Sequence, residues 1–188
     1  MVLTQYSVLG TQYTVLGLLF VWSVVCGGCG PAAKSPRAAA APTPESVKLT
    51  IGDAKALNEL IASHKGDVVF VDYWATWCGP CVQNFPHTVE LAKKYRERGL
   101  ATIAVSFDRL DDELKVRDFL AKQGADFDNM ISQHDAVGQR AFADFDVGPL
   151  PEYRLYDRQG KLNQKWEGQA EEIDKLAAKI EELLAATP

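Results

Sequence analysis

Residues 74–81 read Trp-Ala-Thr-Trp-Cys-Gly-Pro-Cys and end on the second of two closely spaced cysteines, Cys78 and Cys81. An unbroken apolar run precedes them at 68–71, Val-Val-Phe-Val, and predicts a fully buried strand of the kind found in parallel sheets. After Cys81, apolar residues recur at the spacing of a helix: Val82, Phe85, Val89 and Ala92. The pattern therefore places Cys78 where a strand ends and a helix begins.

This position predicts thiol redox chemistry. The unpaired N–H groups and the dipole at the start of a helix favour an anion, so the Cys78 thiol should ionise more easily than that of a free cysteine. Cys81 lies about one turn further along the helix. It is well placed to attack a mixed disulfide formed at Cys78, which makes Cys78 the expected nucleophile and Cys81 the expected resolving thiol.

The four cysteines form two pairs of equal spacing, Cys26/Cys29 and Cys78/Cys81, and such pairs can also bind zinc. Residues 30–77, 48 in all, separate the two pairs. Zinc sites usually have about 15–20 residues there. The first pair also lies in an apolar leader, and the second follows a strand rather than a knuckle loop. We therefore predict no metal site and no cofactor.

Length and charge limit the remaining classes of function. A chain of 188 residues with 47% apolar residues accommodates one domain with a real core, plus additional segments. Its 20 basic and 25 acidic residues give a net charge of −5, and no basic cluster appears. This balance argues against a nucleic-acid-binding surface.

Residues 1–29 form an apolar leader. The stretch at 15–25 is too short for a spanning helix and suits a signal peptide, although no Lys or Arg precedes it, which leaves a misassigned start or an uncleaved anchor open. Cys29, preceded by Gly28, resembles the acylated cysteine of bacterial lipoproteins; a plain cleaved signal is the alternative. Residues 30–46 are rich in Ala and Pro and predict an extended tether before a globular domain at 47–188.

Strands and helices alternate along the globular part. Strands are expected at 47–51, 68–72, 101–107 and 127–132, and a β-hairpin at 151–156 and 162–166. Helices are expected around 57–64 (ended by Gly66), after Cys81, at 111–123 (closed by Gly124), at 136–145 and at 173–184. This order predicts an α/β fold with a largely parallel sheet and an antiparallel hairpin at one edge. His64 is expected to be a packed or boundary histidine rather than a ligand.

The motif at 71–81, Val-Asp-Tyr-Trp-Ala-Thr-Trp-Cys-Gly-Pro-Cys, together with Pro86 and with Pro151 before the hairpin, closely resembles the thioredoxin family over about residues 47–186. The resemblance implies a thioredoxin fold, a central mixed sheet flanked by helices. An additional helix and strand are expected between the strand at 101–107 and Pro151. With a tethered N-terminus, this insertion resembles the TlpA/ResA-type membrane-anchored thiol–disulfide oxidoreductases, which commonly act as reductants in cytochrome c maturation.

Two further groups acquire roles from this resemblance. Asp72 interrupts an apolar strand six residues before Cys78, and desolvation should raise its pKa enough to exchange protons with Cys81 near neutral pH. Trp77, with Gly79 and Pro80 between the cysteines, is expected to shape the surface that meets the substrate.

The family also has a cis-proline that faces the cysteines, and the backbone before it pairs with the substrate strand. Pro149 and Pro151 are both candidates. Counting back from Asp157, which precedes the hairpin turn, favours Pro151, with Leu150 as the pairing residue. Glu152 stands where the family often has threonine. The resemblance therefore specifies the preferred substrate less closely than it specifies the thiol–disulfide reaction.

The resulting expectation is an extracytoplasmic, monomeric reductant of disulfides in client proteins, supplied with electrons by a membrane thiol donor. A disulfide oxidase or isomerase on the same fold is the alternative. A peroxidase is disfavoured because Ala75, rather than threonine, stands three residues before Cys78. A non-enzymatic binding module is disfavoured because a disulfide closing so small a loop would stabilise the fold little.

Overall fold

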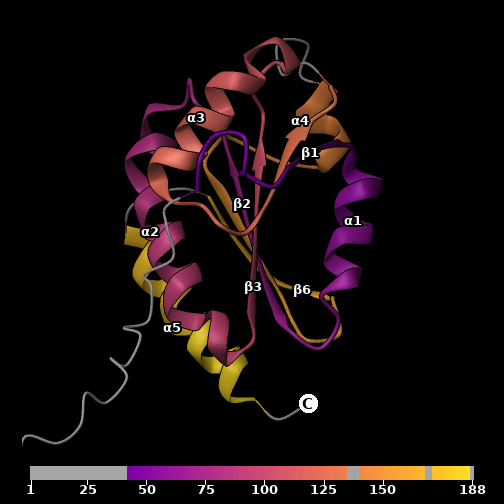
Figure 1. The fold of residues 1–188 in the computed structure, drawn as a ribbon. Coiled ribbons are helices and arrows are strands. Elements are labelled where there is room, and N and C mark those ends of the chain that lie inside the picture. Colours follow the sequence, from indigo (N-terminus) through magenta and orange to yellow (C-terminus); the bar gives the residue numbers. More distant parts are fainter. Residues whose placement is uncertain (1–41, 135–139, 168–170, 187–188) are drawn as a thin grey trace, which may run out of the picture. The chain divides into compact units, whose positions relative to one another are not determined.

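The computed structural model describes residues 42–134, 140–167 and 171–186. Its helices and strands alternate until a terminal hairpin and helix (Figure 1). In chain order they are β1 (Leu49–Gly52), α1 (Ala54–Ser63), β2 (Val68–Trp74), α2 (Gly79–Tyr95), a 3-10 turn (Arg96–Arg98), β3 (Leu100–Ser106), a 3-10 turn (Leu110–Asp112), α3 (Glu113–Gln123), β4 (Asp128–Ser132), α4 (Arg140–Phe145), β5 (Glu152–Tyr156), β6 (Leu162–Glu167) and α5 (Glu171–Ala185).

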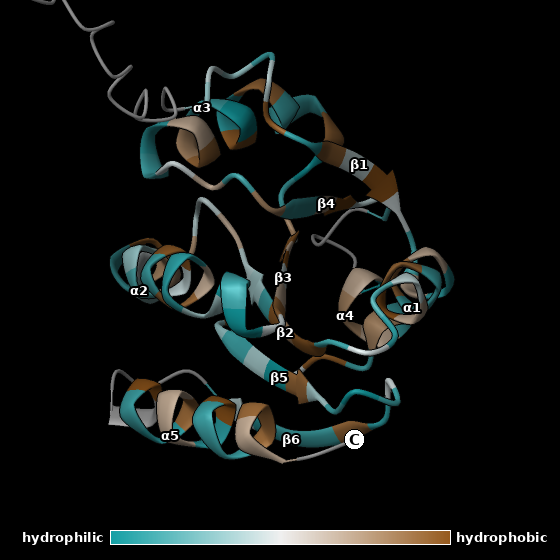
Figure 2. Ribbon diagram, turned by 60° about the horizontal axis from the view of Figure 1, so that its bottom comes forward, coloured by the Kyte–Doolittle hydropathy of each residue, from teal (hydrophilic) through white to brown (hydrophobic). Residues whose placement is uncertain are grey.

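One six-stranded sheet, in the order β1-β4-β3-β2-β5-β6, organises the domain. The first four strands are mutually parallel, and the hairpin β5–β6 adds antiparallel to β2. Helices α1 and α4 cover one face, while α2 and α5 cover the other, with α3 beside α2 (Figure 2). The predicted α/β fold, with its parallel sheet and its edge hairpin, is confirmed.

Strand β2 lies in the interior of this sheet, and all seven of its residues are buried. Alternate side chains of β2 point to opposite faces. Val69 and Val71 join the larger core, whereas Val68 and Phe70 join the smaller core under α2 and α5. Because β2 is covered on both faces, its sequence is almost wholly apolar, and the carboxyl group of Asp72 is carried into the interior with it.

The predicted insertion is present as α3 and β4, which lie between β3 and Pro151. Strand β4 pairs with both β1 and β3, so it widens the parallel part of the sheet. Gly124 closes α3 in the left-handed conformation, with a φ of 71°, as the sequence predicted. The first part of the helix predicted at 136–145 lies outside the described residues, and α4 begins at Arg140.

Helix α1 ends earlier than expected. Its last residue is Ser63; the backbone N–H of His64 donates to the carbonyl group of Ile61, and that of Lys65 donates to the carbonyl group of Ala62. Gly66, with a φ of 106°, instead forms the turn into β2. His64 is the C-cap residue, and its Nε2 atom lies 2.8 Å from the Asp128 Oδ2 atom.

Within the described ranges, no helix has the length and apolar character needed to cross a bilayer.

Candidate active site

Cys78 and Cys81 form a disulfide bond at the start of α2. Cys78 is the N-cap residue, and its sulfur accepts a hydrogen bond from the backbone N–H of Cys81 at 3.3 Å. Pro80 occupies the first turn of the helix, where its missing N–H group costs nothing. The two sulfur atoms therefore lie where helix N–H groups point outward and stabilise negative charge.

The two cysteines differ in their exposure to solvent. Cys78 is 7% exposed and Cys81 is 2% exposed. Trp77, Gly79 and Pro80 are exposed around Cys78, with Trp77 at 55%. These three residues therefore form an exposed rim beside Cys78, the less buried of the two cysteines.

Trp74 has a different environment from Trp77. Its side chain is buried, and its ring centre lies 4.6 Å from that of Phe85 and 4.8 Å from that of Phe119. Since Phe85 is on α2 and Phe119 on α3, this aromatic cluster fixes the inserted helix beside the helix that carries the cysteines.

Asp108, which the sequence analysis did not select, fixes the backbone just before the cysteines. It is fully buried, and its carboxylate accepts from the backbone N–H of Thr76 at 2.9 Å and from the Thr76 hydroxyl at 2.5 Å. The Ser106 hydroxyl donates to the same carboxylate at 2.7 Å. The end of β3 thereby holds the loop that leads from β2 to Cys78. A signal was present in the sequence, since Asp108 is the first charged residue after the buried run of β3.

Asp72 is buried in β2, and burial raises the pKa of its carboxyl group to about 7. The Thr88 hydroxyl donates to its Oδ2 atom at 2.6 Å and opposes this rise. Oδ1 has no hydrogen-bond partner among the residues that the structure describes. Burial also raises the pKa of Tyr153, the residue paired with Asp72 on β5, and the Asp72 charge adds to that rise. The pKa of Asp72 is thus raised, and by burial, as the sequence predicted.

The contact between Asp72 and Thr88 locates the carboxyl group relative to the cysteines. Thr88 follows Cys81 by seven residues, about two turns, so both residues lie on the same side of α2. Both are also buried. Asp72 therefore lies beneath the face of α2 that carries Cys81, but its hydrogen bond is made to Thr88 and not to a cysteine.

The cis peptide bond of the described chain is Leu150–Pro151, so of the two candidate prolines it is Pro151 that has this geometry. Pro151 is buried, and Leu150, two residues before β5, is partly exposed. Glu152 is fully buried. Its side chain therefore faces the interior of the domain.

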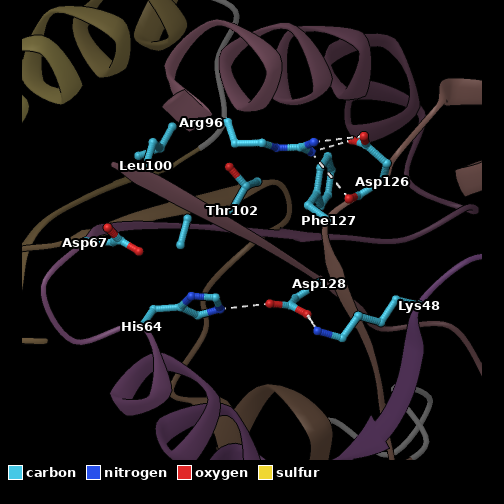
Figure 3. Close-up of a pocket in the computed structure, with 10 residues that line it drawn as sticks. Lys48, His64, Asp67, Arg96, Leu100, Thr102, Asp126, Phe127 and Asp128 are labelled. Atoms are coloured by element: carbon cyan, nitrogen blue, oxygen red, sulfur yellow. Dashed lines mark hydrogen bonds and ion pairs between the residues drawn. The ribbon is translucent and has the colours of Figure 1, made fainter. Parts of the chain in front are cut away.

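A depression of about 310 Å³ lies at the end of the parallel strands opposite the cysteines, beside the first residues of β3 (Figure 3). Five of its charged or titratable side chains are paired with one another. His64 and Lys48 both contact Asp128, and Arg96 pairs with Asp126 at 2.5 Å. Over the described ranges, no group of three His, Cys, Asp or Glu side chains is arranged to hold a metal ion. The Cys78–Cys81 disulfide lies outside this pocket, and we take the cysteine pair as the candidate active site.

Comparison with known proteins agrees with this choice. Residues 38–180 match the Redoxin family. The thiol-disulfide oxidoreductase ResA of Bacillus thuringiensis is 33% identical over 118 residues, which are 63% of this chain and 65% of that protein. The chain thus spans slightly less than two thirds of this relative's length.

Solved structures show the same fold. A thiol:disulfide interchange protein DsbE from Chlorobium tepidum is 31% identical, with a TM-score of 0.57 over 66% of this chain and 85% of the other. A thioredoxin from Neisseria meningitidis is 25% identical, with a TM-score of 0.53 over 65% and 77%. The predicted thioredoxin fold and the predicted similarity to ResA-type proteins are confirmed.

Proposed function

The chain belongs to the redoxin family, and we propose that it is a thiol-disulfide oxidoreductase that reduces disulfides of client proteins outside the cytoplasm. The observation that carries the proposal is the Cys78–Cys81 disulfide at the start of α2, with its exposed rim and a buried carboxyl group of raised pKa beneath the same helix. The ResA and DsbE names of the similar proteins support the same activity.

The reaction begins from the reduced pair. The Cys78 thiolate attacks one sulfur of the client disulfide, which breaks, and the other client sulfur leaves as a thiolate and is protonated. Cys81 then attacks the Cys78 sulfur, the mixed disulfide breaks, and the second client thiol is released. The client gains two electrons and two protons, and the chain is left with the Cys78–Cys81 disulfide.

Asp72 serves as the proton acceptor for Cys81 in the second step. Cys81 is deeply buried, so its thiol is a poor source of thiolate without a nearby base. A carboxyl group with a pKa of about 7 can accept and release a proton near neutral pH. Its Oδ1 atom, which has no hydrogen-bond partner among the described residues, is the proposed acceptor.

The client strand lies across the rim of Trp77, Gly79 and Pro80 and pairs with the backbone of Leu150, beside cis-Pro151. Support comes from the exposure of the three rim residues and from the start of β5 at Glu152, two residues after Leu150. Backbone pairing with an extended segment gives affinity without requiring a particular client sequence.

The direction of transfer is reduction, in a pathway of the cytochrome c maturation type. Gly79 and Pro80 bring neither charge nor side-chain hydrogen bonds to the Cys78 thiolate, and proline has no N–H donor. We therefore expect a potential of roughly −230 to −280 mV, in the range of thioredoxin-like reductants. A membrane thiol donor returns the pair to the reduced state, and the chain acts as a monomer. A potential above about −180 mV would instead indicate an oxidase or isomerase.

The proposed arrangement of the chain is a leader at 1–29, a tether at 30–46 and the thioredoxin-like domain at 47–188. Cys29 carries the lipid anchor. Support comes from the sequence pattern around Cys29, which lies outside the described residues. Wild-type chain should fractionate with membranes, and Cys29→Ala should release it or block processing. Identical soluble mature forms of both would contradict the lipid anchor.

Trapping tests the central proposal. Cys81→Ser should accumulate mixed disulfides between Cys78 and client proteins because the resolving thiol is missing. Cys78→Ser should accumulate none and is the matched control. Equal trapping by the two variants would refute the assignment of roles, and absence of insulin reduction by the wild-type chain would refute the activity.

A further inference from the structure

Glu152 and Arg154 form a charged pair inside the domain. They are two residues apart on β5, so both side chains point to the same face of the sheet. Their side chains are 0% and 9% exposed, and the Arg154 Nε atom donates to the Glu152 Oε1 atom at 2.7 Å. Burying two charges is costly unless their remaining hydrogen-bonding groups are also satisfied. The partners of those groups therefore indicate what the pair does.

Each of the two side chains also binds the backbone of the segment that leads to the cis-proline, and Lys165 of β6 approaches the Glu152 Oε2 atom at 4.0 Å. The Oε2 atom of Glu152 accepts from the backbone N–H of Gly148 at 3.0 Å. Arg154 donates to the backbone carbonyl of Asp146, a residue held at a φ of +50°. Such a conformation is uncommon for a residue other than glycine and needs support from its surroundings. The pair thus holds two backbone groups just before Pro151.

The same pair is also connected to β2, the strand that leads to Cys78. The Arg154 guanidinium lies 4.9 Å from the centre of the Tyr73 ring, and Tyr73 is the residue that pairs with Glu152 across the two strands. A cation over an aromatic ring is attracted to its face. One buried charge pair thus joins the backbone before Pro151 to the strand before the cysteines.

We propose that Glu152 and Arg154 are positioning residues, which hold the backbone at 146–150 so that Leu150 can pair with an extended client strand beside Cys78. The inference rests on the proposed function and deepens it. The pair contacts neither the client nor the sulfur atoms. It acts on the binding of polypeptide clients, and small disulfides that need no backbone pairing do not depend on it.

The test compares two oxidised substrates, insulin and the small disulfide dithionitrobenzoate, with full-length wild-type chain and Glu152→Ala. In Glu152→Ala the KM for insulin should rise about tenfold or more, the scale of a lost hydrogen bond to a charged group. The kcat, the rate with the small disulfide and the potential against glutathione should stay near wild type. Glu152→Gln keeps an acceptor for the Gly148 N–H group and should restore most of the insulin KM.

Each outcome has a definite meaning. An unchanged insulin KM in folded Glu152→Ala overturns the inference, as does an equal loss of rate with both substrates. If Glu152→Ala does not fold, Arg154→Lys carries the test. Lysine keeps the positive charge opposite Glu152 but has no second nitrogen to donate to the Asp146 carbonyl group. The KM for insulin should therefore rise, while the rate with the small disulfide should not change. Failure of the wild-type chain to reduce either substrate would count against the proposed function and not against the positioning role.

Discussion

Replacing Asp72 by asparagine should stabilise the oxidised chain, and the gain should depend on pH. The pKa of this carboxyl group is 3.8 in an unperturbed environment and about 7 in the folded chain. This difference of about three pKa units corresponds to about 4 kcal/mol of unfolding free energy. Such an amount is a large part of the total of a small domain, which is about 5–15 kcal/mol.

Whether the unfolding free energy rises or falls with pH depends on whether the folded or the unfolded chain holds the proton of Asp72. Below about pH 4 Asp72 is protonated in both the folded and the unfolded chain, so it adds no pH dependence to the unfolding free energy. Between about pH 4 and 7 the unfolded chain releases the proton while the folded chain keeps it, so wild-type stability falls as the pH rises. Above about pH 7 the unfolding free energy of the wild-type chain has fallen by the full amount. Asp72→Asn has no proton to lose and escapes this fall.

Urea unfolding of the oxidised forms at pH 4.5, 6 and 8 measures the effect. The difference between Asp72→Asn and wild type should grow by about 3–4 kcal/mol from pH 4.5 to pH 8. Asp118→Asn makes the same chemical change at an exposed position of α3 and is the control. A constant difference between Asp72→Asn and wild type across this range would refute the argument that burial keeps Asp72 protonated.

Three other changes have expected outcomes. Thr88→Val removes the hydrogen bond that lowers the pKa of Asp72, so the midpoint of the pH–rate profile should move to higher pH; a downward move would contradict this. Asp108→Asn keeps the size of the side chain but weakens its hold on Thr76, and should lower the unfolding free energy by about 1–3 kcal/mol in urea. A change below about 0.5 kcal/mol would show that Asp108 is not needed there. Phe85→Ala should cost about 3–5 kcal/mol, because this ring is fully buried, and calorimetry should show a lower melting temperature.

The sequence predicted those parts of the fold that depend on local patterns. The apolar run of β2 and the helical spacing after Cys81 are enough to place Cys78 at a helix start. The raised pKa of Asp72 could be predicted because an acid within an otherwise apolar, buried strand is desolvated. Counting from Asp157 selected Pro151 because the length of a hairpin strand is a local property.

The parts that were missed depend on contacts between distant segments. Thr88 is 16 residues from Asp72, and Asp108 is 32 residues from Thr76, so neither pairing has a local pattern. The inward orientation of Glu152 depends on a partner, Arg154, whose guanidinium group compensates a charge that would otherwise be expected at the surface. Such partners become visible only when the strands and loops are brought together.

The bridge between Cys78 and Cys81 also links electron transfer to folding through a closed thermodynamic cycle. The oxidised and reduced chains can each unfold, and the two unfolded chains interconvert with the potential of an unconstrained pair. The difference between the two unfolding free energies must therefore equal the difference between the folded and unfolded potentials, at about 1.4 kcal/mol for each 30 mV. Every contact that favours the disulfide over the dithiol at the start of α2 makes the chain a stronger electron donor. Unfolding measurements on the oxidised and reduced chains, and equilibration of the folded and unfolded chains against a redox buffer, therefore give the same free-energy difference.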